Sequence, residues 1–148
     1  MTSGLLEAKY IYCKGADSVE DELIKHTVLD VLGCEIKELN KDRVVIAMPI
    51  TDAARQPFGL LHGGVSVVLA ESCASIGTWL NIDQETQSTV GIEINANHVR
   101  AKRDSTVTAT AIPLHKGPTT SVWDIRITDE EGRLVCVSRC TIAMVNGH

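Results

Sequence analysis

Aromatic side chains are scarce in this sequence, since two Trp, two Tyr and one Phe make up only 3% of its 148 residues. Aromatic residues usually supply much of the area that a core buries. The core must therefore consist mainly of Val, Ile, Leu and Ala. A chain of this length suits one domain with a substantial core, and the sequence contains no internal repeat, low-complexity tract or interdomain linker.

An excess of positive charge is also missing, because 14 Lys and Arg residues stand against 19 Asp and Glu and give a net charge of −5. Proteins that bind nucleic acid usually present a basic surface, so no such partner is expected. No apolar run is long enough to cross a membrane, and residues 1–15 lack the pattern of a signal peptide. These absences predict a cytoplasmic protein without a membrane partner.

The cysteines are odd in number and never occur with CxxC spacing. Disulfide frameworks and zinc sites usually show paired, regularly spaced cysteines. We interpret all of them as free thiols, and the sequence implies no metal and no redox cofactor. They are Cys13, Cys34, Cys73, Cys136 and Cys140.

Hydrophobic alternation predicts strands on both sides of one long helix. A short helix is expected over Ser18–Thr27, with Ser18 as its N-cap. Residues 129–132, DEEG, have the composition of a hairpin turn. Along residues 88–97 the apolar side chains alternate regularly with other residues, and they are Val90, Ile92, Ile94 and Ala96. The expected strands cover residues 34–39, 43–50, 88–97, 105–112, 119–128 and 133–145.

The order of these elements is strands, one long helix and then four strands in a meander. An antiparallel sheet with one apolar face must cover that face, and the long helix is the available cover. We therefore predict an α+β domain over residues 28–148, in which a curved sheet wraps one helix. Residues 1–27 form an N-terminal segment before it.

The stretch Gln56–Leu80 is the most informative part of the sequence. Pro57 and Gly59 exclude a regular helix at its beginning, and HGG at 62–64 then leads into apolar and small residues at helical spacing. One carboxylate, Glu71, interrupts this apolar run. Burying an ionised carboxylate without a partner is costly, so Glu71 either faces solvent or has a chemical role.

The start of this helix is suited to acyl transfer. The first amides of a helix have no partner within it, and the helix dipole adds positive potential there. A carbonyl oxygen that becomes negative during the reaction would be stabilised at Gly63. Glu71 follows Gly63 by eight residues, or roughly 12 Å along a helix. Glu71 therefore cannot attack a carbonyl that its own helix polarises, which predicts a homodimer with active sites at its interface.

Several motifs resemble those of a known family. The run QPFGLLHGG at 56–64, followed by LAES at 69–72, GIEINANHVR at 91–100 and PLHKG at 113–117, is similar to the hotdog-fold acyl-CoA thioesterases. The resemblance covers roughly residues 28–145. It is closest to the branch that acts on aromatic acyl-CoAs, such as hydroxybenzoyl-CoA and 1,4-dihydroxy-2-naphthoyl-CoA. It implies a hotdog fold and a homotetramer built as a dimer of dimers.

The resemblance also implies roles for individual residues. Glu71 is the catalytic carboxylate, and the Gly63 amide, with His62 beside it, forms the oxyanion hole. Gln56 positions the thioester, and Ser75, one helical turn after Glu71, holds the carboxylate or the attacking water. Plainer interpretations exist for three of them: His62 as a helix cap, Gln56 as a loop residue and Ser75 as a packing residue.

A basic cluster is expected to bind the nucleotide end of coenzyme A, which is part of the substrate and not a cofactor. The 3′-phosphate and pyrophosphate of CoA favour Arg and Lys at the rim of a site. The alternative is a solvated strand end without a ligand. The predicted substrate-binding residues are His98, Arg100, Lys102, His115 and Gly117, with Arg103 and Lys116 beside them.

The predicted reaction is hydrolysis of an aromatic acyl-CoA, with Glu71 acting as nucleophile or as general base towards water. The residues leave both mechanisms open. One alternative function is a dehydratase or hydratase of 3-hydroxyacyl thioesters, which would use a His and a carboxylate as acid and base. A second is a non-catalytic acyl-CoA sensor, which should lack the carboxylate. Because His62 precedes two glycines and Glu71 is present, the thioesterase is the favoured interpretation.

Overall fold

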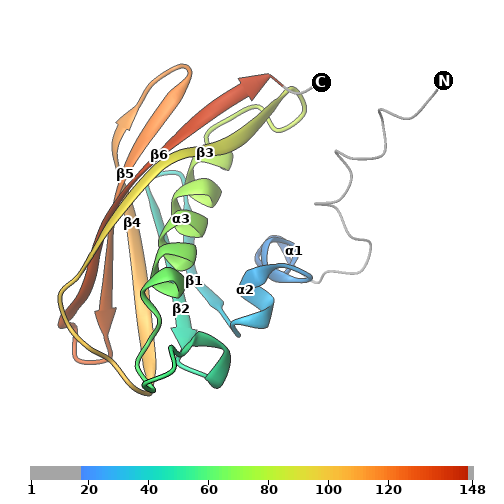
Figure 1. Cartoon of the computed structure of the whole chain (residues 1–148). Helices are drawn as coiled ribbons and strands as arrows, with labels where there is room; N and C mark the ends of the chain where they lie inside the picture. The colour runs from blue at the N-terminus through green and yellow to red at the C-terminus, as the bar shows by residue number, and fades with distance from the viewer. Residues whose placement is uncertain (1–17, 147–148) are drawn as a thin grey trace.

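The computed structural model describes residues 18–146, which form a six-stranded antiparallel sheet curved around one long helix (Figure 1). This helix is α3 (Gly63–Trp79). Two short helices, α1 (Val19–Ile24) and α2 (Val28–Val31), precede the sheet, and the 3-10 turn η1 (Asp52–Ala54) precedes α3. The strands are β1 (Glu35–Asn40), β2 (Arg43–Pro49), β3 (Gln87–His98), β4 (Thr106–Lys116), β5 (Thr120–Asp129) and β6 (Leu134–Asn146). The predicted fold class, a sheet wrapped around one helix, is confirmed.

The strands lie in the order β1-β2-β4-β5-β6-β3, and neighbouring strands are antiparallel. The predicted meander is therefore wrong for β3, which pairs with β6 and not with β4. Figure 1 shows the connection from β3 to β4 crossing one end of the sheet. Side-chain alternation predicts a strand but not its partner, and consecutive strands are neighbours in only about two-thirds of cases.

Two capping side chains divide the segment that was predicted as one helix, 18–27. Ser18 accepts a hydrogen bond from the Asp21 amide at 3.2 Å, which confirms it as the N-cap of α1. Thr27 accepts from the Leu29 amide at 3.1 Å and caps α2. Because an N-cap residue has extended backbone, Thr27 cannot belong to the preceding helix, and α1 ends earlier, at Ile24.

The regular alternation predicted along 88–97 is interrupted by a β-bulge. Gly91 pairs with Ile142 of β6, whereas Glu93 pairs with Thr141, so β3 carries one extra residue at this point. Beyond the bulge, Ile94 packs against the core. Before and within it, Val90 and Ile92 remain exposed. The extra residue reverses which side chains face the helix, because strand side chains point to alternate faces.

α3 packs on the sheet through a glycine and a buried tryptophan. A Cβ built on Gly77 would lie 2.5 Å from Cη2 of Trp123 on β5, so the ring lies directly against the helix. The indole Nε1 donates to the hydroxyls of Thr78 at 2.9 Å and Ser121 at 3.0 Å. All of these side chains are buried. The contact fixes both the distance and the rotation of α3 relative to the sheet.

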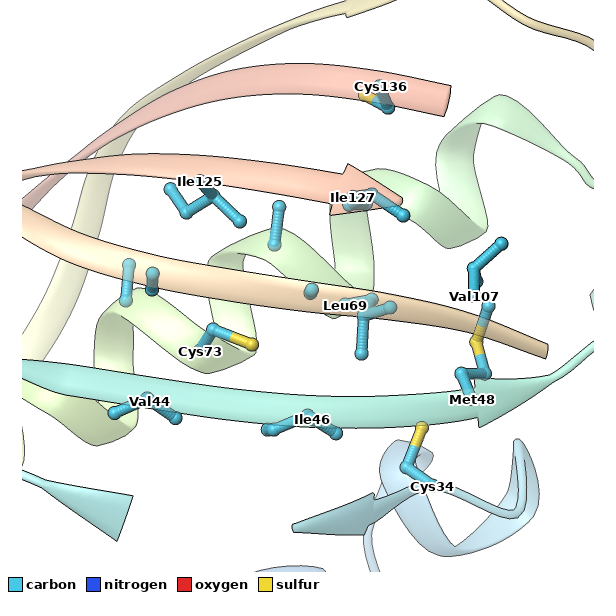
Figure 2. Close-up of a cluster of buried hydrophobic side chains, with 14 of the residues drawn as sticks. Cys34, Val44, Ile46, Met48, Leu69, Cys73, Val107, Ile125, Ile127 and Cys136 are labelled. Carbon is cyan, nitrogen blue, oxygen red and sulfur yellow. The ribbon is translucent and has the colours of Figure 1, made fainter. Parts of the chain in front are cut away.

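The rest of the core is mainly aliphatic, as the shortage of aromatic residues predicts. Figure 2 shows Leu69 and Cys73 of α3 close to Val44 and Ile46 of β2. The hairpin predicted at 129–132 is present between β5 and β6. Local turn composition and strand periodicity were therefore sufficient to predict these elements.

Replacing Gly77 by Ala tests the packing of α3. The added methyl group meets the buried Trp123 ring, so we expect the free energy of unfolding to fall by about 1–3 kcal/mol. Denaturant unfolding followed by tryptophan fluorescence measures this change. Ser72→Ala, which alters a half-buried α3 residue away from that ring, is the control and should stay within about 0.5 kcal/mol of the wild type. If both variants lost the same free energy of unfolding, the contact between Gly77 and Trp123 would not be the cause.

Candidate active site

A tight loop leads the chain into α3 and fixes the start of the helix. Arg55 and Leu61 form an isolated antiparallel bridge across this loop. The Leu61 amide donates to the carbonyl of Lys102 at 2.7 Å, and the His62 amide donates to the carbonyl of Ala54 at 2.8 Å. The first turn of α3 is thus held from both sides before any ligand binds.

His62 is the N-cap of α3. Its Nδ1 atom accepts a hydrogen bond from the Gly64 amide at 2.9 Å. This bond satisfies one of the amides at the start of the helix that have no partner within it. Within residues 18–146 the amide of Gly63 has no hydrogen-bond acceptor, as expected for the first residue of a helix. The Gly63 N–H group is therefore the donor that remains available to a ligand.

Gly63 lines a cavity of about 390 Å³, which we call the Gly63 cavity. The loop before α3 and the segment after β3 form its walls. Five residues that the sequence singled out lie around it: Gln56, Gly63, His98, Arg100 and Lys102. The structure thus brings together the predicted oxyanion donor, the predicted positioning residue and three predicted substrate-binding residues.

The side chains of Gln56 and His98 shape this cavity. The Gln56 carboxamide oxygen accepts a hydrogen bond from the Phe58 amide, which leaves its NH₂ group as the part that can donate to a ligand. The His98 ring lies against the helix start, because a Cβ built on Gly63 would lie 2.8 Å from His98 Nε2. The φ of Gly63 lies outside the left-handed region, so a side chain at 63 would disturb the His98 ring and not the backbone conformation.

The two cations of the cavity differ in their availability. Lys102 forms an ion pair with Glu130 at 2.7 Å, and its side chain is only 11% exposed. Arg100 is exposed and donates from Nε to the carbonyl of Leu134 at 3.3 Å. Arg100 therefore presents its guanidinium at the rim, whereas the charge of Lys102 is already paired.

Glu71 lines a different cavity of about 370 Å³, which we call the Glu71 cavity. Ser75 lines it too, but no hydrogen bond joins the two side chains in the described part of the chain. Leu23 of α1, together with Thr27 and Val28 at the start of α2, forms part of its wall. These wall residues were not predicted, because no sequence motif marks them.

The Glu71 carboxylate also lies against β3. A Cβ built on Gly91 would collide with Glu71 Oε1 and would lie 3.2 Å from its Cδ. Gly91 was not among the predicted site residues. The one available signal was a glycine inside a strand pattern, which is typical of a close approach or a bulge.

Among residues 18–146, the Gly63 cavity and the Glu71 cavity of one chain share no lining residue. Both groups belong to the same continuous helix, so their separation of roughly 12 Å cannot be closed by a local adjustment. The structure therefore agrees with the separation that the sequence predicts. One chain holds both chemical groups but does not bring them into one cavity.

The predicted basic cluster is divided in a single chain. Gly117 lines a small cavity with Thr78 and Asn81, at the end of α3 that is opposite to Gly63. His115 lies beside Gly117, since a Cβ built there would be 2.7 Å from His115 Nε2. The grouping of these residues with His98 is therefore wrong for one chain, because the alternation of a strand does not show at which end of the sheet it finishes.

The described cysteines are free, as predicted, and all of them are buried, whereas Cys13 lies outside the described residues. Burial raises the pKa of Cys34 to about 11, and burial, with smaller effects of Glu71 and Glu93, raises the pKa of Cys140 to about 12. These thiols stay protonated near neutral pH and are poor nucleophiles. Among residues 18–146 no group of three or more His, Cys, Asp or Glu is arranged to hold a metal, and no helix there is long and apolar enough to span a membrane.

A sequence model of the thioesterase superfamily matches residues 58–136 of this chain. The chain belongs to the thioesterase superfamily. This thioesterase is 50% identical over 115 residues to the 1,4-dihydroxy-2-naphthoyl-CoA hydrolase of Listeria monocytogenes, an alignment that covers 78% of this chain and 93% of the relative.

Crystal structures of other thioesterases have the same fold. A mutant thioesterase from Pseudomonas aeruginosa superposes with a TM-score of 0.83 at 39% identity, over 89% of this chain and 97% of that one. A hypothetical thioesterase from Streptococcus pneumoniae, determined with coenzyme A, superposes with a TM-score of 0.69 at 26% identity, over 78% and 88% of the two chains. These findings confirm the hotdog fold and the enzyme class, an acyl-CoA thioesterase.

Proposed function

We propose that this thioesterase hydrolyses an aromatic acyl-CoA to the free acid and CoA at a site shared by two subunits. The Gly63 amide of one subunit polarises the thioester carbonyl, and Glu71 of the partner subunit supplies the carboxylate. One observation carries the proposal: the two groups line separate cavities of one chain although they lie on the same helix. The aromatic acyl group is proposed from the motifs and from the named activity of the Listeria relative.

Strand β3 is the surface that we assign to the dimer interface. It is an edge strand of twelve residues, and a long unpaired edge is a template for pairing with another chain. Val90 and Ile92 on this strand expose 48% and 57% of their surface. Pairing of two β3 edges across a two-fold axis would satisfy the free backbone groups and extend the sheet from one subunit to the other.

The direction of β3 relative to α3 makes such pairing complete the site. Gly63 lies beside His98 at one end of β3, whereas Glu71 lies beside Gly91, seven residues earlier. Antiparallel pairing of two copies sets the His98 end of one strand against the Gly91 region of the other. Glu71 of the partner subunit would then face the Gly63 cavity, and the same contact repeats on the other side of the axis.

The chemistry follows in one of two ways from these groups. As nucleophile, a Glu71 oxygen attacks the thioester carbon, the C–S bond breaks, CoA leaves as the thiolate, and water then hydrolyses the anhydride. As general base, Glu71 takes a proton from the water that attacks the same carbon. In both, the Gly63 N–H donates to the oxyanion and the Gln56 NH₂ group orients the thioester, while Ser75 orients the carboxylate or the water.

His62 contributes to this site through the helix cap. By accepting from the Gly64 amide, its ring holds the first turn of α3 so that the Gly63 amide stays free. The capping contact suits a supporting role in oxyanion stabilisation better than proton transfer. A dehydratase would instead need a histidine that exchanges a proton with the substrate.

The two ends of the substrate are assigned to the two cavities. The Gly63 amide inside its cavity contacts the thioester, and the rim of that cavity, with His98, Arg100 and Lys102, faces outward to the phosphates of CoA. The Glu71 cavity, with Leu23 and Val68 in its wall, suits the acyl group. The determination of the Streptococcus thioesterase with coenzyme A supports a CoA ligand on this fold. His115 and Gly117 would reach the nucleotide only from another subunit, which fits the dimer of dimers that we still predict. The cytoplasmic location also remains a prediction.

Glu71→Gln should abolish most turnover and leave CoA binding nearly unchanged, because the shape is kept while the base or nucleophile is lost. Loss of a general base typically lowers kcat by about 10²–10⁴-fold. Thiol release from hydroxybenzoyl-CoA, 1,4-dihydroxy-2-naphthoyl-CoA and aliphatic acyl-CoAs measures both the loss and the acyl preference. A variant that retains more than about a tenth of the activity would exclude Glu71 as the catalytic group. Water loss from a 3-hydroxyacyl thioester would favour a dehydratase.

Arg100→Ala should raise KM for acyl-CoA by about tenfold, with little effect on kcat, because a charge-assisted contact to a remote phosphate is lost. An acyl-pantetheine substrate lacks the nucleotide, and its KM should hardly change. Arg126→Ala removes the same charge from β5, at a residue that pairs with Asp124, and serves as the control. Equal damage with both substrates would show that Arg100 does not contact the nucleotide.

Mixed dimers of Gln56→Ala and Glu71→Ala subunits test the shared site. One interface site of such a dimer collects both substitutions, and the other collects neither. Random mixing makes about half of the dimers mixed, each with one intact site of two, so about a quarter of the wild-type activity should return. The two variants are unfolded together, refolded and assayed beside each variant refolded alone. Activity no higher than the average of the two would place both residues in the site of a single chain.

A further inference from the structure

The backbone conformation at position 91 does not explain why a glycine is found there beside Glu71. A Cβ at Gly91 would collide with Glu71 Oε1. The φ of Gly91 lies outside the left-handed region, so its backbone would accept any residue. Glycine is needed at 91 only because the carboxylate occupies the space where a side chain would begin.

Because of the β-bulge, Gly91 faces α3, so the volume that a side chain at 91 would fill lies beside the helix. Gly91 faces Glu71 before the bulge, and Ile94 and Ala96 face the core after it. With regular alternation, residues at odd and even positions cannot face the same side of a sheet. The extra residue between the register positions Gly91–Ile142 and Glu93–Thr141 removes that conflict. The bulge therefore allows β3 to pack on the core and still leave open space beside Glu71, which agrees with the tendency of bulges to occur next to active sites.

The surroundings of Glu71 suggest that its position is set by shape. Within residues 18–146 its carboxylate makes no hydrogen bond or ion pair. Ser72, its neighbour on the helix, donates instead to the carbonyl of Val68 at 2.7 Å. The side chain has three rotatable bonds, so its direction depends on which space is open to it.

We propose that Gly91 is a positioning residue for Glu71, and that the bulge of β3 makes this possible. Because Gly91 has no side chain, the Glu71 carboxylate can occupy the position from which it reaches the thioester carbon. The inference rests on the proposed catalytic role of Glu71. It adds a residue on a different element, which acts on the reaction only through the carboxylate.

A methyl group at 91 should move the carboxylate without unfolding the protein. The atom that it meets is the end of a flexible side chain, which can rotate away. Alanine in a strand is also more favourable than glycine by roughly 0.5–1 kcal/mol. The expected signature is therefore a loss of turnover at unchanged or increased stability, which is the opposite of a packing defect.

The first experiment measures kcat, KM, the melting temperature and the oligomeric state of Gly91→Ala. We expect kcat to fall on the order of 10²-fold, since a displacement of about 1 Å of a reacting group has such an effect. KM and the melting temperature should stay close to the wild-type values. Thr108→Ala, at a half-buried residue of the interior strand β4, is the control and should retain the wild-type kcat. Wild-type kcat in Gly91→Ala would overturn the proposal.

A second experiment asks whether the loss acts through the carboxylate. Glu71→Asp shortens the side chain by one methylene, so a methyl group at 91 no longer meets the carboxylate. Gly91→Ala should therefore lower kcat on the order of 10²-fold in the Glu71 background but less than about threefold in the Asp background. Equal effects in both backgrounds would overturn the positioning role. If Gly91→Ala does not fold, Gly91→Ala combined with Glu71→Ala decides: recovered folding supports the contact, and continued unfolding excludes it.

These results separate the inference from the proposed function. An active Gly91→Ala beside an inactive Glu71→Gln would overturn the positioning role and leave the catalytic role of Glu71 intact. An active Glu71→Gln would overturn the proposed mechanism itself, whatever Gly91→Ala does.

Discussion

The close contact between α3 and Trp123 is the constraint on which the rest of the structure depends. Because Gly77 has no side chain, the indole ring lies directly against the helix, and its Nε1 donates to the hydroxyl of the adjacent Thr78. A rotation of α3 about its axis would break this hydrogen bond and bring a larger residue against the ring. With the rotation fixed, the start of the helix lies beside His98 and the carboxylate of Glu71 faces β3.

One continuous helix carries both groups to which we propose roles in thioester hydrolysis, the Gly63 amide, which has no acceptor among the described residues, and the Glu71 carboxylate. Helix geometry orients each group well and at the same time prevents them from meeting in one chain. The edge strand β3 lies beside both groups, at His98 and at Gly91. The two-fold pairing that we propose along that strand would bring the Gly63 amide of one subunit and the Glu71 carboxylate of the other into one site.

Three glycines of this chain share one physical role, which is to leave space for a larger side chain from a different element. Gly63 lies against His98, Gly77 against Trp123, and Gly91 against a carboxylate oxygen, and none of the three has a left-handed φ. Gly63 could be assigned from the sequence because it belongs to a continuous motif. Gly77 and Gly91 could not be assigned, because the side chains that they accommodate come from distant parts of the chain.

The sequence by itself determined the fold class, most element boundaries to within a few residues, and the separation of Gly63 and Glu71. These properties depend on local periodicity, helix rise and a motif within one continuous run. Only the tertiary structure decided that β3 pairs with β6, that His115 lies far from His98 in one chain, and that Gly91 borders Glu71. Such contacts join residues that are distant in sequence, and they are set by the packing of the whole core, which no local pattern records.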